Sequence, residues 1–174
     1  MYHALVRRKV TGVFDQLSTK DYPSVLAGVA DDVHHTFSGD HPLGGERRSR
    51  MALERWFERL YNLCPSLRFE VGEVIAKGWP WRTVVAVQWE ACVTPQQGEP
   101  YVNHGVHLLR IRWGRVVSIH AYEDSQKVAA ACRRMAEAGI EEAAARPITD
   151  ELAARSPSPS GGCARPDEQG AGDA

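Results

Sequence analysis

The stretch YVNHGVHLLRIRWGRVVSIHAYED, residues 101–124, decides the fold class. It holds two long runs rich in β-branched and aromatic residues, separated by a tight turn around Gly114. This pattern predicts two antiparallel strands joined by a hairpin, because a short connection reverses the chain at once. Two earlier runs, LRFEVGEVIAKG (67–78) and WRTVVAVQWEACV (81–93), have the same character. The second half of the chain is therefore predicted to be an antiparallel meander.

The chain before residue 65 has helical periodicity instead. Residues 4–17 carry apolar side chains at spacings near three and four. Asp21 can cap a short helix that reaches Ala30, and Ser49 can cap a longer helix that ends before Pro65. After the last strand, residues 125–138 predict a closing helix that stops at Gly139. Helices followed by long strands predict an α+β cone, in which a curved antiparallel sheet packs on three N-terminal helices and leaves a pocket between the layers.

The composition predicts one folded domain with a tail. Residues 1–145 have the apolar content of a core, whereas residues 146–174 are mostly Pro, Ser, Gly, Ala and charged residues. A segment with so little to bury does not recover the entropy of ordering, so we expect this tail to be disordered. The uncovered outer face of the sheet predicts a homodimer.

Charge and hydropathy exclude several classes of protein. The 174 residues have a formal net charge of -1, which argues against nucleic acid and anionic membranes as partners. The basic run ERRSR (46–50) is interpreted as a solvated helix start. No apolar run approaches the roughly 20 residues of a membrane span, and the first residues lack the apolar core of a signal peptide. Four scattered cysteines predict free thiols, and with them a cytoplasmic protein.

Histidines are the most informative polar residues. Three of the seven lie in VHHTFSGDHPLGG (33–45), where proton transfer, metal binding and a polar loop are all open interpretations. Strand parity separates His35 from His34, and groups Asn103 with His107 on the face opposite to His104. Three imidazoles are a common zinc ligand set, but no HxxxH or HxH spacing supports one here. We therefore expect neither a metal nor a cofactor.

The quoted strands and three shorter motifs resemble a known group. ADDV (30–33), HPLGGERRSRMALERWF (41–57) and GRVVSIHAYED (114–124) are similar to the SnoaL-like polyketide cyclase branch of the nuclear transport factor two-like superfamily. Its relatives include ketosteroid isomerase and limonene epoxide hydrolase. The resemblance covers about residues 5–135 and implies a cystatin-like α+β barrel. It also implies that the faces carrying Asn103 and His107, Trp89, and Ala121 point into the pocket.

The resemblance carries the family's catalytic groups over only in part. It aligns His107 with the neutral oxyanion-binding Asp of ketosteroid isomerase, and His41, beside Asp40, with its catalytic base. Phe14 lies beside the position of the oxyanion-binding Tyr, which is missing. Ala121 stands where cyclases and epoxide hydrolases have an Asp. The family chemistry is therefore not inherited intact.

Strand parity and the family resemblance together predict the residues of the site. Its catalytic candidates are His107, His41 and His35, with His41 near the pocket mouth. Its ligand-binding candidates are Asn103, Trp89, Phe14, Trp56, Ala121 and Glu123. Glu123 is a possible base, although an unpaired glutamate at a strand end is expected to reach solvent. The expected partner is a small apolar molecule. Two functions stay open: a cofactor-free isomerase, cyclase or dehydratase acting on a polyketide-like or other apolar carbonyl compound, and a non-catalytic ligand-binding or adaptor protein.

Overall fold

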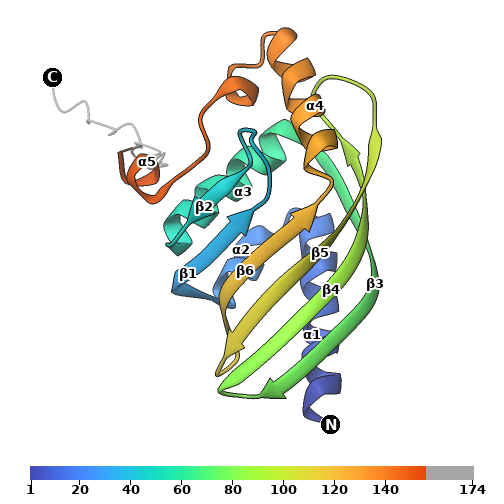
Figure 1. Cartoon of the computed structure of the whole chain (residues 1–174), viewed down its shortest axis with the longest axis vertical. Coiled ribbons are helices and arrows are strands. Elements are labelled where there is room, and N and C mark those ends of the chain that lie inside the picture. The colour runs from blue at the N-terminus through green and yellow to red at the C-terminus, as the bar shows by residue number, and fades with distance from the viewer. Residues whose placement is uncertain (156–174) are drawn as a thin grey trace, which may run out of the picture.

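A six-stranded sheet and the helices on its concave side form the framework of the protein (Figure 1). The computed structural model describes residues 1–155. The elements in chain order are α1 Tyr2–Ser18, α2 Tyr22–Ala27, β1 Val29–Phe37, β2 Gly45–Arg47, α3 Arg50–Leu63, β3 Ser66–Trp79, β4 Arg82–Thr94, β5 Tyr101–Arg112, β6 Arg115–Glu123, α4 Ser125–Glu137, the 3₁₀ turn η1 Glu141–Ala144 and α5 Asp150–Arg155.

The sheet confirms the predicted meander and adds one parallel contact. The strand order is β2-β1-β6-β5-β4-β3, and the pairs from β3 to β6 are antiparallel. β1 pairs with β6 in parallel, because α3 and four strands separate them in the sequence and allow a crossover. In Figure 1, α1, α2 and α3 lie behind the curved sheet. The predicted α+β cone is confirmed.

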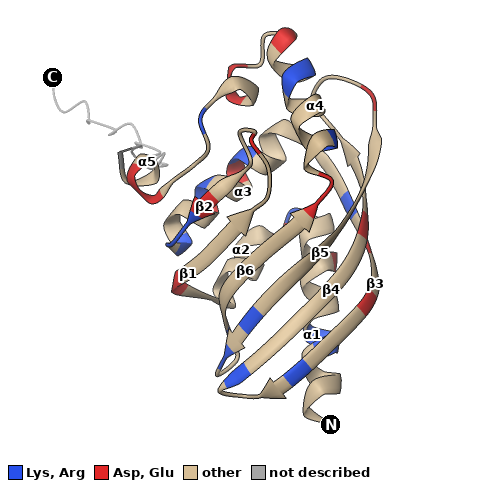
Figure 2. Cartoon of the chain, in the orientation of Figure 1, with Lys and Arg blue, Asp and Glu red and all other residues tan. Residues whose placement is uncertain are grey.

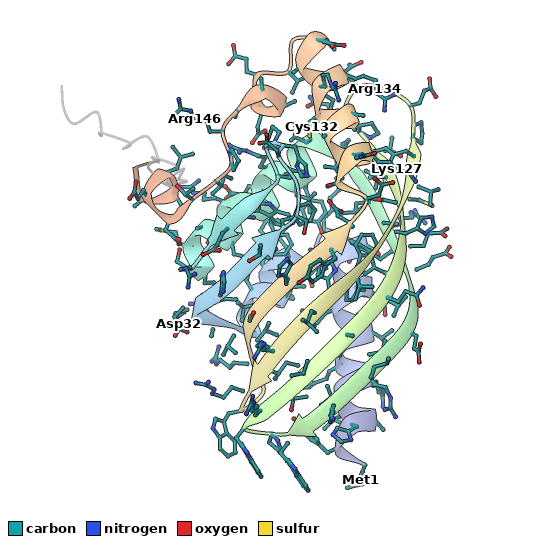
Figure 3. The ribbon with its side chains drawn as sticks, viewed as in Figure 1. Met1, Asp32, Lys127, Cys132, Arg134 and Arg146 are labelled. Atoms are coloured by element: carbon teal, nitrogen blue, oxygen red, sulfur yellow. The ribbon has the colours of Figure 1, made fainter. Side chains whose placement is uncertain are left out.

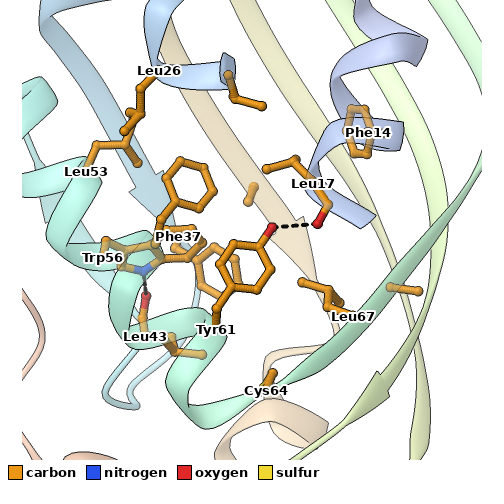
Figure 4. Packing of buried hydrophobic residues seen from close by; sticks show 14 of the residues in the cluster. Phe14, Leu17, Leu26, Phe37, Leu43, Leu53, Trp56, Tyr61, Cys64 and Leu67 are labelled. Carbon is orange, nitrogen blue, oxygen red and sulfur yellow. Dashed lines mark hydrogen bonds between the residues drawn. The ribbon is translucent and has the colours of Figure 1, made fainter. Parts of the chain in front are cut away.

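Side-chain hydrogen bonds fix the helices and join them to the core. The carboxylate of Asp21 accepts from the backbone N–H of Ser24 at the start of α2, and the hydroxyl of Ser49 does the same for Ala52 in α3. Two large buried aromatics also find partners: Trp56 Nε1–H donates to the Leu43 carbonyl, and the Tyr61 hydroxyl donates to the Leu17 carbonyl, both over 2.7 Å (Figure 4). Because of these bonds, the buried polar atoms of Trp56 and Tyr61 keep hydrogen-bond partners inside the apolar core.

Helical structure occurs beyond residue 145, where the folded domain was predicted to end. The side chains of Ile148 and Ala153 are buried, and α5 packs beside α3. The Asp150 carboxylate accepts hydrogen bonds from Arg48 N–H and from the Ser49 hydroxyl, which explains why this short segment docks. Composition alone missed these few anchoring contacts. Residues 156–174, the rest of the predicted tail, lie outside the described residues.

The outer face of the sheet carries exposed apolar side chains. Ile75 on β3, Val106 on β5 and Tyr122 on β6 are exposed, although single exposed apolar residues are common on protein surfaces. We keep the homodimer through this face as a prediction. Sedimentation velocity at micromolar concentration is expected to show a dimer, and a monomer at all concentrations would contradict it.

Within residues 1–155, no helix has the length and hydropathy needed to cross a membrane.

Candidate functional site

A cavity of about 790 Å³ lies between the concave face of the sheet and the helices. This volume is within the roughly 300–1,000 Å³ range of sites that bind small molecules. Most of the wall is apolar, and it includes Phe14, Trp56 and Trp89 from the predicted set. The polar groups that the sheet contributes beside this wall include His35 on β1, Asn103 and His107 on β5, and Glu123 on β6. The site therefore combines an apolar wall with a few polar groups.

The cavity opens at the end of the molecule where α1 begins. Exposed residues of α1 contribute to its lining there, among them Leu5, Arg8 and Lys9. Gly28 after α2 and Gly114 in the β5–β6 turn complete this exposed part of the lining. A ligand would enter between α1 and these two turns.

His107 is held as a neutral hydrogen-bond donor. The indole Nε1–H of Trp89 donates to His107 Nδ1 over 2.6 Å, and an indole nitrogen can only donate. The single ring proton of neutral His107 therefore lies on Nε2, which has no protein partner within residues 1–155. Burial in the apolar wall lowers the pKa of His107 to about 4. The Phe14 ring meets the imidazole edge-on at 5.3 Å and fixes its plane.

Gly105 makes the contact between Trp89 and His107 possible. Gly105 lies directly opposite Trp89 in the β4–β5 pair, between the inward-facing Asn103 and His107. A Cβ atom at Gly105 would collide with the Trp89 ring and with the Tyr122 carbonyl. The missing side chain thus leaves the space over which the indole crosses to His107.

Substitution of Gly105 by Ala is expected to destabilise the protein by about 1–3 kcal/mol, the usual cost of overpacking a core. The displaced indole should also lose its bond to His107. Urea unfolding would measure the first effect, and near-ultraviolet circular dichroism of the tryptophans the second. Gly72→Ala is the matched control, because a Cβ there meets only ordinary contacts with Gln88. Equal stability of the two variants would contradict the prediction.

His35 is the second neutral imidazole of the cavity. The buried Arg47 donates from Nη1 to His35 Nδ1 over 3.0 Å, so the ring proton of His35 also lies on Nε2. Burial, and next the positive charge of Arg47, hold the pKa of His35 well below its ordinary value. The Trp56 ring packs 4.7 Å from the imidazole and 5.5 Å from the Arg47 guanidinium carbon.

Arg47 is a buried cation with no ion pair among the described residues, although the charge of Asp150 acts on it from a longer distance. It is fully buried, and its second donor, Nη2, bonds to the Gly44 carbonyl over 2.7 Å. Burial lowers the pKa of Arg47 to about 10, so the guanidinium stays charged at neutral pH. A positive charge one side chain behind the cavity favours negative charge on a bound ligand.

Glu123 is the one carboxyl group on the cavity wall of the described chain. Asn103 Nδ2–H donates to its Oε2 over 3.2 Å, and its Oε1 is buried with no partner. Burial, and next the neighbouring Asp124, raise the pKa of Glu123 to about 8. The side chain was expected to reach solvent; it is half-buried instead, lines the cavity and has its Oε1 cut off from solvent.

The cysteine and tyrosine near Glu123 do not supply a nucleophile. Cys64 and Tyr101 also line the cavity, and burial raises the pKa of the Cys64 thiol to about 12. Burial raises the pKa of Tyr101 as well. Both groups are neutral at physiological pH, and a thiol without its thiolate form is a poor nucleophile. The reactive groups of this cavity are therefore the carboxyl and the imidazoles.

A family model places the chain among known proteins. The model described as the SnoaL-like domain matches residues 10–119, which carry most of the cavity lining but not Glu123. The chain belongs to the SnoaL-like domain family. The sequence matches no curated protein.

Solved structures share the fold of this SnoaL-like protein at low sequence identity. An NTF2-like protein of unknown function from Burkholderia pseudomallei has 23% identity and a TM-score of 0.64, and the match covers 71% of this chain and 94% of the other. A proposed scytalone dehydratase from Novosphingobium aromaticivorans has 9% identity, a TM-score of 0.59, and coverage of 68% and 80%. A proposed SnoaL-like polyketide cyclase from a Jannaschia species has 16% identity, a TM-score of 0.57, and coverage of 71% and 88%.

Two predicted site residues lie outside the cavity of the SnoaL-like domain. His41 was expected near the mouth, but its Nε2–H donates to the Ser38 carbonyl over 3.1 Å, and the ring packs against Gly39 at the far end of β1. Ala121 is fully buried and pairs with His107 across β5 and β6, yet it does not line the cavity. Its methyl group is too short to reach past its neighbours. Neither residue can contact a ligand in this cavity.

His34 and His104, which strand parity placed on the sides opposite to His35 and His107, lie outside the cavity as expected. His34 Nε2 is 3.3 Å from Glu46, and His104 Nδ1 is 3.4 Å from Glu90, both on the outer surface. Arg47 is the residue that the sequence interpretation missed, because the ERRSR run was read as a solvated face. Arg47 lies opposite His35 in the short β1–β2 pair, and the sequence did not predict this pair.

Proposed function

We propose that this protein is a cofactor-free acid–base enzyme that acts on an apolar carbonyl compound, such as a polyketide-like molecule, through an enolate. The observation that carries the proposal is the buried carboxyl of Glu123, with its pKa near 8, on a wall shared with two neutral imidazoles. A glutamate tuned toward neutrality is a strong base when ionised and an effective acid when protonated. At pH 7 roughly one-tenth of Glu123 is ionised and ready to act as a base.

The first step is removal of a proton from the carbon next to the carbonyl. The ionised Glu123 carboxylate takes this proton, and the C–H electrons form a C=C bond while the carbonyl π electrons move to oxygen. His107 donates its Nε2–H to the oxygen that becomes negative. A neutral imidazole suits this task, because it donates a hydrogen bond without being a charged acid. In an apolar cavity such a preset donor stabilises the oxyanion more than water does.

The remaining polar residues support this step. His35 offers a second Nε2–H, and Arg47, which contacts His35 Nδ1, adds positive charge close to the enolate. Asn103 holds the Glu123 carboxyl through its amide N–H. Asn103 and His107 both point inward from β5, two residues before and two residues after Gly105. Gly105 pairs with Glu123 on β6. Diagonal neighbours of this kind lie roughly 7–8 Å apart, which leaves room for the reacting atoms of a ligand.

The fate of the enolate defines the reaction class. Return of the proton from Glu123 to a different carbon is an isomerisation, and its delivery to a leaving hydroxyl is a dehydration. Attack of the enolate carbon on a second carbonyl, whose oxygen then takes the proton from Glu123, is a cyclisation. The likeness to a proposed dehydratase and a proposed cyclase supports these classes. The base differs from the family pattern, since Ala121 takes the position of the usual last-strand Asp and Glu123 follows two residues later.

Proton exchange tests the proposal without knowledge of the substrate. A panel of hydrophobic cyclic ketones is incubated with the protein in heavy water, and NMR follows loss of the protons next to the carbonyl. Thermal unfolding with the same panel reports binding. We expect some ketones both to raise the unfolding temperature and to exchange faster with the protein than without it. Ketones that bind but never exchange would contradict the enzyme and support the non-catalytic ligand-binding protein.

A further inference from the structure

Three tryptophans are exposed together at the end of the molecule where the cavity opens. Trp79, Trp81 and Trp113 are 66%, 52% and 70% exposed. The rings of Trp79 and Trp81 stack with centroids 5.7 Å apart, and Trp113 lies 6.1 Å from Trp81. The β3–β4 and β5–β6 turns that carry them are joined by a hydrogen bond from Trp113 N–H to the Pro80 carbonyl. We call these three residues the tryptophan tip; they neither fill the core nor lie on the outer sheet face.

The tryptophan tip does not serve the stability of the fold. Trp113 has a φ of 51° in the two-residue turn with Gly114, a left-handed conformation that Asn, Asp and Gly adopt more easily. A bulky side chain in this region adds backbone strain. Exposed indole rings also forgo the hydrophobic stabilisation that burial would bring. A strained and exposed aromatic cluster points to a contact outside the chain.

A ring of positive charge surrounds the tip. The three segments that meet there, residues 1–14, 74–89 and 105–122, contain no Asp or Glu. They contain exposed basic side chains, namely Arg7, Arg8, Lys9, Lys77, Arg82, Arg110, Arg112 and Arg115. In Figure 2 these blue segments gather at one end of the sheet and on α1, while most acidic segments lie elsewhere. The protein therefore has a strongly basic end although its formal net charge is -1.

The cavity mouth lies within this basic, apolar end. Leu5, Arg8, Lys9, Pro80 and Gly114 belong to the cavity lining as well as to the segments that form the tip. Leu5 and Met1 are exposed there too, and Met1 marks this end in Figure 3. His3 ties the start of α1 to the tip through a hydrogen bond between its Nε2 and the Gly78 carbonyl. Whatever binds the tip also covers the entrance.

We propose that the tryptophan tip docks on an anionic lipid membrane, with the cavity mouth facing the bilayer. Indole rings favour the boundary between headgroups and acyl chains. Exposed Lys and Arg are attracted to anionic headgroups, and each adds to the affinity. A second copy of the chain is a poor occupant, because a symmetric contact would bring two basic rings together. Passage of an apolar ligand from the bilayer into the cavity rests on the proposed function; docking itself does not.

Vesicle binding tests the proposal. The full chain is sedimented with vesicles of phosphatidylcholine alone or mixed with phosphatidylglycerol, at low and high salt. We expect binding only to the mixed vesicles, weakened by salt. Trp81→Ala with Trp113→Ala, and separately Arg110→Gln with Arg112→Gln, should each weaken binding about tenfold or more. Matched controls at other surfaces are Met51→Ala with Leu152→Ala, and Arg133→Gln with Arg134→Gln near the end marked by Arg134 in Figure 3. Circular dichroism checks that every variant is folded.

Several outcomes would overturn the docking. These are absence of binding to mixed vesicles, equal losses in the control variants, and binding to soluble polyglutamate that exceeds vesicle binding and ignores the tryptophan substitutions. The last result would assign the basic end to an acidic protein. Ketone exchange, measured on the same variants in vesicle-free buffer, should be unchanged. Failure of vesicle binding with normal exchange therefore removes only the docking, whereas loss of exchange with normal vesicle binding removes only the enzyme.

Discussion

Substitution of Glu123 by Gln is expected to slow exchange of ketone α-protons by roughly 10²–10⁴-fold, the usual contribution of a positioned general base. Glutamine has nearly the same shape and can still accept the hydrogen bond from Asn103, but it cannot take a proton. The cavity should therefore keep its volume and its ligands. Unfolding temperature in the presence of ketones is expected to rise as in the wild type, which separates loss of chemistry from loss of binding.

The pH profile gives this prediction a second readout. Because burial raises the pKa of Glu123 to about 8, the wild-type exchange rate should increase with pH up to about 8 and then level off. The Glu123→Gln variant should lack this rise. Glu90→Gln is the matched control, since Glu90 lies on the outer face of β4, 3.4 Å from His104. A Glu123→Gln variant with wild-type exchange would show that Glu123 is not the base.

The same carboxyl makes stability depend on pH in a defined direction. The pKa of Glu123 is raised in the folded protein, so its stabilising contribution is complete below pH 4.5 and is lost as pH rises through about 8. Full loss corresponds to an order of 5 kcal/mol, since one pKa unit equals about 1.4 kcal/mol. We expect the Glu123→Gln variant to gain stability relative to the wild type between pH 5 and 8, as measured by urea unfolding across roughly this range.

Acidification is expected to destabilise the wild type relative to a His107→Gln variant. The pKa of His107 is lowered to about 4 in the folded protein, so its contribution is complete above its ordinary pKa of 6.5 and is lost as pH falls toward 4. The loss is about 3 kcal/mol. Glutamine can still accept the Trp89 hydrogen bond but does not titrate. Urea unfolding at closely spaced pH values would measure the difference between the two proteins.

A difference measurement is needed here because the buried carboxyl and the two buried imidazoles have opposite effects on stability as the pH changes. Between pH 6.5 and 4.5 the raised pKa of Glu123 adds stability on acidification, while the lowered pKa values of His107 and His35 remove it. The wild-type curve alone can therefore look flat. His104→Gln is the control, as it removes a histidine from the outer side of the same strand. If the His107→Gln difference stays constant with pH, His107 is not held neutral by burial.

Strand parity is the part of the site that the sequence predicts well. Along β5, Asn103 and His107 share one side and His104 takes the other, because successive side chains of a strand point to opposite faces. Knowing the family tells which of these sides faces the cavity. The same reasoning placed Trp89 and His35 at the wall. It failed for Ala121, which has the inward parity but a side chain too short to reach the cavity.

Loop and strand-end residues could not be placed in this way. His41 lies in an irregular loop, where no periodicity states which way a side chain points, and it turned out to bond to Ser38. Glu123 ends its strand, so only the contact with Asn103 and the surrounding cover decide that its carboxyl loses water. Arg47 is buried because β2 pairs with β1, and three residues are too few to show a strand pattern.

The sequence by itself therefore determines the order of the longer elements, the family and the side of each long strand on which a residue lies, since these depend on local spacing. Only the tertiary structure decides which polar groups are cut off from water, because that depends on what distant segments cover. Glu123 and His107 obtain opposite pKa shifts from the same cause, burial, which disfavours the charged form of each. The tryptophan tip likewise exists only where two turns more than thirty residues apart in sequence, at Pro80 and Trp113, meet through one hydrogen bond.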